Sequence, residues 1–144
     1  MNPTLEKFGF PDTTIQEYDH WVVMLRPKQV TLGSLVLAEK SEATSYGAIS
    51  EAAQLEQKQV VADIEATLQN LFGAEKFNYL MLMMVDPNVH FHVLPRYSTP
   101  ATFEGQTFTD TSWSGPPDLK AIQDIPAEAW AKLLQHLREH WQTN

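Results

Sequence analysis

The feature that most restricts the fold is one change of hydrophobic period in the middle of the chain. From about residue 44 to residue 72, apolar side chains recur at helical spacing among Glu, Gln and Lys, and Gly73 follows as a natural helix end. The recurring residues are Ile49, Ala53, Val60, Ile64, Leu68 and Leu71. On both sides of this segment the sequence is rich in β-forming residues. One long helix inserted between strands predicts an α+β domain on a mainly antiparallel sheet of about five strands.

Short β-rich runs define the predicted strands. Three precede the helix and one follows it, at residues 14–18, 21–25, 34–38 and 77–85. The 77–85 run is apolar on both faces, as expected of a strand that is covered on both sides or lies at a subunit interface. Asp86-Pro87 then predicts a turn into a fifth strand, which carries two histidines.

The C-terminal third is expected to be irregular before it ends in a helix. Residues 98–125 are rich in Ser, Thr, Pro and Gly, with Phe103, Phe108 and Trp113 as aromatic anchors. An apolar stripe from Pro126 to about Trp141 predicts the C-terminal helix. We therefore expect a single domain over residues 1–144, with a core at about 14–97 and the irregular loop and helix at 98–144.

Composition and charge exclude several classes of protein. The formal net charge of −8 disfavours binding to a nucleic-acid polymer, although it leaves room for a small anionic ligand in a locally positive pocket. No apolar run reaches the roughly 20 residues that span a bilayer. The N-terminal residues lack the apolar region of a secretory signal, so we expect a cytoplasmic protein without membrane contacts. The absence of cysteine excludes disulfides, thiolate zinc sites and cysteine nucleophiles.

The candidate functional residues lie in the stretch VDPNVHFHVLPRY, residues 85–97. Because strand side chains alternate between the two faces of a sheet, Asn88, His90 and His92 share one face. The opposite face of the same strand is apolar. This arrangement predicts a polar surface with two imidazoles close together.

Three interpretations of the histidine pair remain open from the residues alone. His90 and His92 can be ordinary polar residues on an exposed strand face. A metal site would need further ligands, for which His136, His140 or Glu104 are weak candidates. Alternatively, a neutral imidazole can attack a phosphoryl centre while the second imidazole hydrogen-bonds the phosphate or the departing atom.

The surrounding sequence resembles a known family. Residues 88–96, NVHFHVLPR, resemble the signature of the histidine triad superfamily, in which three histidines alternate with hydrophobic residues and Pro-Arg often follows. Here Asn88 stands in place of the first histidine. Residues 25–38, LRPKQVTLGSLVLA, also resemble a family segment, and the order of elements agrees over residues 14–97.

The resemblance implies roles for the two histidines. His90 matches the histidine that attacks the α-phosphate to give a covalent nucleotidyl intermediate, which water then resolves. His92 matches the histidine that lies beside the phosphate and the leaving group. No metal or other cofactor is required for this route. Asn88 can still hydrogen-bond a ligand but cannot carry a positive charge.

Several positions depart from the family pattern and are candidates for substrate binding. Ser34 stands where a further active-site histidine usually lies, and Arg26 stands where an acidic or amide residue grips the ribose. Arg26 either holds an additional phosphate or carboxylate or is a solvated residue at a strand end. Met24 is a minor candidate for contact with the base. The glycine-rich loop of the family is shortened here to Asp86-Pro87.

The sequence thus predicts a hydrolase or transferase acting at the α-phosphate of a nucleotide conjugate or dinucleoside polyphosphate. The alternative is a nucleotide-binding or phosphate-binding protein that keeps the fold without efficient turnover. A homodimer is expected in either case, because a strand as apolar as residues 77–85 is expected to be buried against a partner subunit.

Overall fold

A five-stranded antiparallel sheet forms the centre of the computed structural model, which describes residues 2–143. Its strand order is β1-β2-β3-β5-β4. The strands are β1 (Thr14–Glu17), β2 (Trp21–Leu25), β3 (Leu35–Glu39), β4 (Lys76–Leu80) and β5 (His90–Arg96). Every pairing between neighbouring strands is antiparallel. The predicted α+β class and five-stranded sheet are therefore confirmed.

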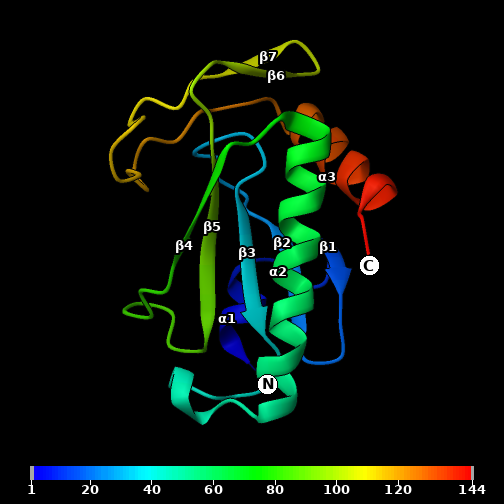
Figure 1. Cartoon of the computed structure of the whole chain (residues 1–144), viewed down its shortest axis with the longest axis vertical. Helices are drawn as coiled ribbons and strands as arrows, with labels where there is room; N and C mark the ends of the chain where they lie inside the picture. Colours follow the sequence, from blue (N-terminus) through cyan, green and yellow to red (C-terminus); the bar gives the residue numbers. More distant parts are fainter. Residues whose placement is uncertain (1, 144) are drawn as a thin grey trace.

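Two main helices lie against one face of the sheet (Figure 1). Helix α2 (Glu51–Phe72) connects β3 to β4, and α3 (Ala127–His140) follows the irregular region, as predicted. Helix α2 begins at residue 51 rather than 44, because the Ser50 side chain accepts a hydrogen bond from the Ala53 amide and caps the helix there. It ends at Gly73, which has a φ of +74° and so adopts the left-handed conformation expected of such a stop.

The main hydrophobic core lies between α2, α3 and the sheet. Alternate residues of the central strands enter it, including Trp21, Val23 and Leu25 of β2. The Trp21 indole also donates a hydrogen bond of 2.7 Å to the carbonyl of Ala53 in α2. This contact ties the helix to the sheet at a point with no solvent exposure.

A short N-terminal helix that the sequence reading missed covers the opposite face. Helix α1 (Pro3–Lys7) has Asn2 as its N-cap, whose side chain accepts hydrogen bonds from the first-turn amides, and Pro3 in the first turn. An Asn-Pro pair at a helix start is a recognisable signature. In Figure 1, α1 lies behind the sheet and α2 in front of it. The second apolar cluster consists of Leu5, Val22, Met24, Val36 and Ala38, with Phe8 and Phe10 packed against it.

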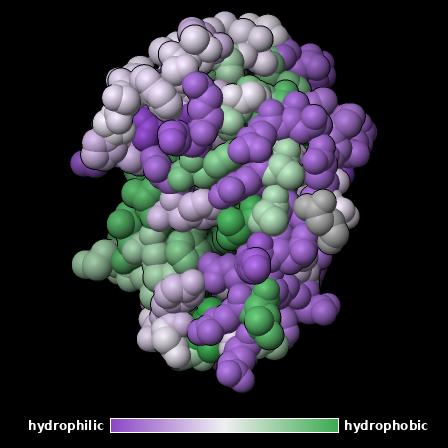
Figure 2. Space-filling model, in the orientation of Figure 1, coloured by the Kyte–Doolittle hydropathy of each residue, from purple (hydrophilic) through white to green (hydrophobic). Residues whose placement is uncertain are grey.

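Strand β4 is shorter than predicted and lies at the edge of the sheet. Leu80 is its last residue and pairs with His92, whereas residues 81–85 form a loop. The prediction of a strand over 77–85 was wrong in its second half. Beyond the pair of Leu80 with His92, β5 has only Phe91 and His90 left, so residues 83–85 have no partner in that strand. Figure 2 shows hydrophobic residues gathered over β4 and this loop. Leu82, Met84 and Val85 are 51%, 87% and 80% exposed.

The region after β5 contains a small hairpin within otherwise irregular structure. Strands β6 (Ala101–Phe103) and β7 (Gln106–Phe108) pair across a turn at Gly105, which has a φ of +75°. Phe108 is buried, and Phe103 stacks edge-on against Phe72 of α2, so both act as the expected anchors. None of the helices described between residues 2 and 143 combines the length and hydrophobicity needed to cross a membrane.

Candidate functional site

The predicted alternation of the histidine strand is present in the structure. His90 pairs with Ala38 and His92 with Val36, so both imidazoles lie on the sheet face that α1 covers. The two ring centroids are 5.3 Å apart in an edge-to-face arrangement. The Phe8 ring lies 5.6 Å from the ring of His90 and 5.7 Å from that of His92. The two histidines are therefore close together and are largely shielded by the N-terminal segment.

An opening beside this ring cluster forms what we call the histidine cleft, and it has two lobes. The cationic lobe has a volume of about 360 Å³ and is lined by Lys7, Phe8, Arg26, Pro27, Lys28, Asp86 and His92. The apolar lobe has a volume of about 220 Å³ and is lined by Leu82, Met83, Met84, Val85, Asp86, His90 and His92. His92 and Asp86 belong to both lobes, so a ligand held at His92 has access to a charged side and an apolar side.

His90 is held in one orientation by the backbone. Its Nδ1 lies 2.7 Å from the carbonyl oxygen of Asn88. A carbonyl oxygen only accepts, so Nδ1 must carry the hydrogen of this bond. In the neutral ring this leaves the lone pair on Nε2, which is the atom available for attack on an electrophile.

His92 is neutral near pH 7 because of its surroundings. Burial, followed by the positive charge of Arg26 and the neighbouring His90, lowers the pKa of His92 to about 4, although Asp86 opposes the shift. The Nδ1 atom of His92 is buried and has no hydrogen-bond partner within the described structure. A neutral imidazole of this kind can hydrogen-bond a phosphate oxygen without first losing or gaining a proton.

Arg26 is brought to the same cleft from the end of β2. Its side chain donates from Nη1 to the carbonyl oxygen of Lys28 at 2.6 Å, whereas its Nε is buried without a partner. Burial lowers the pKa of Arg26, but a guanidinium remains charged under all ordinary conditions. Among residues 2–143, no carboxylate forms an ion pair with it.

Ser34 and Met24 line neither lobe of the histidine cleft. The Ser34 hydroxyl donates to the Thr31 carbonyl at 2.7 Å and accepts from the Val30 and Thr31 amides, so it holds the turn between β2 and β3. Met24 is fully buried in the cluster beneath α1. The structure gives these two residues roles in folding, and their contact with a ligand stays a prediction.

Asn88 also lies outside both lobes and just ahead of β5. Its Oδ1 accepts a hydrogen bond of 3.0 Å from the Thr4 hydroxyl, and its Nδ2 donates to the Glu42 carbonyl at 3.1 Å. Its backbone amide donates to the same Thr4 hydroxyl. Asn88 therefore joins α1 to the loop after β3, while its carbonyl orients His90.

Among the charged and aromatic residues that line the cleft, four were not singled out from the sequence as ligand contacts. Lys7 and Phe8 come from the unpredicted N-terminal helix and the residue after it, and Lys28 comes from the turn after β2. Asp86 was read only as a turn residue, but its carboxylate pairs with Lys7 at 3.0 Å across the cleft. The Asn-Pro helix start was the available signal for the first two, whereas no local pattern marks the others.

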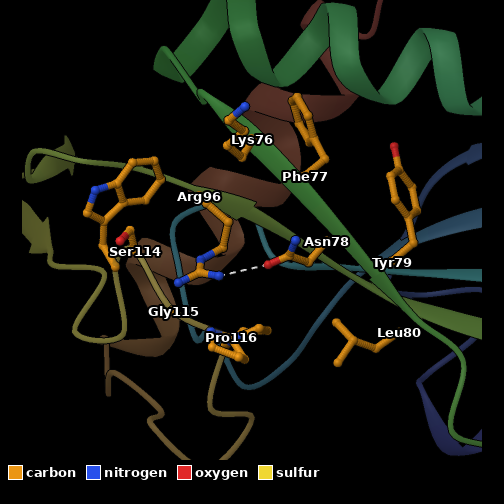
Figure 3. Close-up of a pocket in the computed structure, with 11 residues that line it drawn as sticks. Lys76, Phe77, Asn78, Tyr79, Leu80, Arg96, Ser114, Gly115 and Pro116 are labelled. Atoms are coloured by element: carbon orange, nitrogen blue, oxygen red, sulfur yellow. Dashed lines mark hydrogen bonds between the residues drawn. The ribbon is translucent and has the colours of Figure 1, made fainter.

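A larger cleft lies at the β4 edge of the sheet, and we call it the edge cleft. It has a volume of about 750 Å³ and is lined by residues 76–80 of β4, Arg96 and residues 113–117. In Figure 3, Arg96 points toward Asn78, and the 113–117 loop faces the strand. Arg96 donates to both carboxylate oxygens of Asp110, at 2.6 and 3.0 Å, and to Asn78 at 2.7 Å. Each of the three guanidinium nitrogens of Arg96 therefore has a partner within the protein.

The remaining histidine pair lies on α3. The ring centroids of His136 and His140 are 4.4 Å apart, and His136 also stacks on Phe72 and Phe103. Over residues 2–143, no group of three or more His, Asp or Glu side chains is placed to hold a metal ion. The rings on α3 thus have aromatic packing partners of their own.

Comparison with known proteins identifies the fold. No protein-family model and no curated protein matches the sequence. The structure is similar to a histidine triad protein from Sinorhizobium meliloti 1021, with a TM-score of 0.72 and 20% identity over 97% of this chain and 95% of that chain. It is similar to a histidine triad protein from Bradyrhizobium japonicum, with a TM-score of 0.69 and 14% identity over 99% of this chain and 97% of that chain.

A third similar structure comes from an archaeon. It is a hypothetical histidine triad nucleotide-binding protein from Sulfolobus tokodaii strain 7, with a TM-score of 0.63 and 20% identity over 89% of this chain and 82% of that chain. Taken together, these similarities show that the chain has the fold of the histidine triad proteins over nearly its whole length.

Proposed function

We propose that the chain is a histidine triad hydrolase or transferase acting at the α-phosphate of a nucleotide conjugate or dinucleoside polyphosphate. His90 is the nucleophile, and His92 contacts the phosphate and the leaving group. The observation that carries the proposal is the hydrogen bond from His90 Nδ1 to the Asn88 carbonyl, which leaves Nε2 as the free ring nitrogen beside the cleft. The fold shared with histidine triad proteins supports the same assignment.

The proposed reaction has two steps. The lone pair of His90 Nε2 attacks phosphorus, and the bond from phosphorus to the leaving group breaks with its electron pair. Water, or another acceptor in a transfer reaction, then attacks phosphorus and breaks the bond to Nε2, and solvent takes the proton released by the attacking water. His90 is thereby restored, and neither step requires a metal or other cofactor.

The test is direct detection of the intermediate. We expect the protein to release AMP from diadenosine tetraphosphate or adenosine phosphoramidate, and to gain the mass of one nucleotidyl group when quenched in alkali. Activity should persist in a chelator and disappear in His90→Asn, whose amide can still donate to the Asn88 carbonyl. Absence of both turnover and adduct across these substrates would contradict the proposal.

A second candidate is a protein that binds the nucleotide or phosphate without efficient turnover. Two observations favour it: His90 is only 2% exposed, and the Phe8 ring lies against both imidazoles. On this alternative, nucleotide raises the melting temperature while no adduct forms on His90. The same experiment therefore separates the two functions.

We also propose that the chain forms a homodimer through the edge of its sheet. Strand β4 has one unpaired edge, and the adjoining loop exposes Leu82, Met84 and Val85. An open edge beside exposed apolar residues is normally covered by a partner. Light scattering should give twice the chain mass for the native protein and a monomer for the double variant Met84→Glu, Val85→Lys.

A further inference from the structure

The guanidinium of Arg26 has hydrogen-bonding capacity that the protein does not use. Arginine offers five N–H donors. Nη1 of Arg26 donates to the Lys28 carbonyl, and the buried Nε has no partner in the described part of the chain. A desolvated guanidinium with free donors and no carboxylate partner is matched to an anionic ligand rather than to a neutral one.

The turn that carries Arg26 is held rigidly. The Gln29 side chain donates to the carbonyls of Arg26 and Ser34 at 2.7 and 2.9 Å, and it accepts from the Gly33 amide at 2.9 Å. The Trp130 indole of α3 donates to the same Arg26 carbonyl at 3.2 Å. The backbone under Arg26 is therefore fixed before any ligand arrives, which reduces the entropy lost on binding.

The charges of the cationic lobe are unbalanced. Lys7 is paired with Asp86 at 3.0 Å, whereas Arg26 and the exposed Lys28 form no ion pair within residues 2–143. Two positive charges thus remain uncompensated in a chain with a formal net charge of −8. A local positive potential on an acidic protein selects small anions over anionic polymers.

The cationic lobe is also separate from the apolar lobe, where the proposed nucleophile His90 lies. His90 lines the apolar lobe, whereas Arg26 and Lys28 line the cationic lobe, and the two lobes share His92. A phosphoryl group held between His90 and His92 leaves the cationic lobe open to another part of the same ligand. The volume of that lobe, about 360 Å³, is large enough for a further phosphate.

We infer that Arg26 and Lys28 form a second anion subsite, which binds a phosphate group of the ligand other than the one held at His90 and His92. The inference rests on the proposed function only in requiring that the cleft takes a phosphorylated ligand. The second phosphate can be joined to the first through an anhydride, or it can lie elsewhere on the nucleoside. The shared requirement is two phosphate groups on one small molecule.

The test compares binding of three nucleotides by calorimetry at fixed ionic strength. AMP has one phosphate, ADP has two joined by an anhydride, and adenosine 3′,5′-bisphosphate has two at separate positions. We expect at least one of the two-phosphate ligands to bind about tenfold or more tightly than AMP, because each charge-assisted pair contributes at this level. The tighter of the two identifies where the second phosphate lies.

Matched variants assign the effect to the subsite. Arg26→Gln and Lys28→Gln should each reduce the preference for the two-phosphate ligand while leaving AMP affinity within about twofold, and Arg26→Lys should restore part of it. Lys58→Gln removes an equally exposed cation from α2, on the other side of the sheet, and should change nothing. Melting temperatures of all variants report whether they are folded.

The outcomes separate this inference from the proposed enzyme. Equal affinity for all three nucleotides, or a preference that survives Arg26→Gln and Lys28→Gln, would overturn the subsite. A preference that depends on these residues in a protein with no turnover and no His90 adduct would support the subsite while contradicting the hydrolase.

Discussion

The histidine cleft and the edge cleft contain arginines in opposite situations. Arg96 of the edge cleft lies on the same face of β5 as the two histidines, and its side chain is engaged by Asp110 and Asn78. Arg26 of the histidine cleft has a buried Nε without a partner. The edge cleft is the larger, at about 750 Å³ against 360 and 220 Å³ for the two lobes.

The two clefts differ in how far their polar side chains are already bound within the protein, and volume alone does not reveal this difference. In the edge cleft, the guanidinium of Arg96 is already bound by Asp110 and Asn78, so a ligand would have to displace these bonds to reach it. In the histidine cleft, a buried imidazole nitrogen and a buried guanidinium nitrogen lack partners, so a ligand can satisfy them. The smaller cleft is therefore the better candidate for binding and chemistry.

The largest expected effect is loss of the nucleophile. His90→Asn should lower kcat/KM about 10,000-fold, equivalent to roughly 5 kcal/mol of transition-state stabilisation, because it removes the ring nitrogen that is proposed to form the covalent bond. The measurement is AMP release per folded molecule. The same substitution at exposed His140 is the control, and comparable losses in both variants would remove the assignment of the chemistry to this cleft.

Removing the ion pair between Arg96 and Asp110 in the edge cleft should reduce stability instead of activity. Arg96→Met should lower the free energy of unfolding by about 3–5 kcal/mol, because Asp110 is left as an uncompensated charge with only 3% of its side chain exposed. Although burial raises the pKa of Asp110, the hydrogen bonds from Arg96 and Tyr97 outweigh it and hold the pKa below its ordinary value.

Chemical denaturation measures the effect of Arg96→Met. Arg138→Met, at an exposed arginine that bonds only backbone carbonyls among the described residues, should cost less than about 1 kcal/mol. Specific activity of the folded Arg96→Met variant should equal that of the native protein. A large loss of specific activity would mean that the two clefts are coupled.

Acid should weaken the fold through His92. Because its pKa falls from 6.5 in the unfolded chain to about 4 in the folded protein, unfolding takes up a proton between these values. The contribution of neutral His92 to the free energy of unfolding is fully present above pH 6.5. It is lost as the pH falls toward 4, by roughly 3 kcal/mol in total. Arg26, His90 and Asp86 act on this pKa, and Lys7 and Lys28 line the same lobe as His92.

Comparison of the native protein with His92→Gln isolates this contribution. We expect the variant to lose less stability than the native protein between pH 6.5 and 4, as measured by denaturant unfolding at each pH. The pKa of His136 is also lowered by burial, and its contribution is present in both proteins and cancels. Equal slopes in the two proteins would show that His92 is not held neutral by its surroundings.

The smallest effect is expected at the rim of the edge cleft. Trp113 is 38% exposed there, so Trp113→Ala should cost about 1 kcal/mol or less and leave kcat/KM within about twofold. Steady-state kinetics on the substrate that the native protein turns over provides the measurement. A tenfold loss of kcat/KM would make the edge cleft part of the binding site, so the two clefts would no longer differ in function.

Much of the fold could be predicted because its signals are local. The helical spacing before Gly73 predicted α2, and alternation placed His90 and His92 together on one face. Two errors concerned the ends of elements. Residues 81–85 are apolar enough for a strand, but only 81 and 82 would still lie opposite residues of β5. Ser50 starts α2 later than its hydrophobic pattern suggests.

The candidate site was predictable only in part. His90, His92 and Arg26 converge on one cleft, but Lys7 and Phe8 reach it from α1 and the residue after it, more than 80 residues earlier in the chain than the histidines. The side chain of Asn88 bonds Thr4 and the loop after β3, and its predicted contact with a ligand stays a prediction. No spacing rule relates such distant residues.

Residue order and composition were enough to predict the order of the five sheet strands and the two long helices, the face that carries the histidines and the acidic charge that disfavours nucleic-acid polymers. These follow from backbone periodicity and composition, which neighbouring residues set. The packing of distant segments places Phe8 against the imidazoles, leaves Nε of Arg26 without a partner and gives each guanidinium nitrogen of Arg96 one. Those outcomes depend on which distant side chains meet, because a charge or a ring acquires its function from the partners that packing places around it.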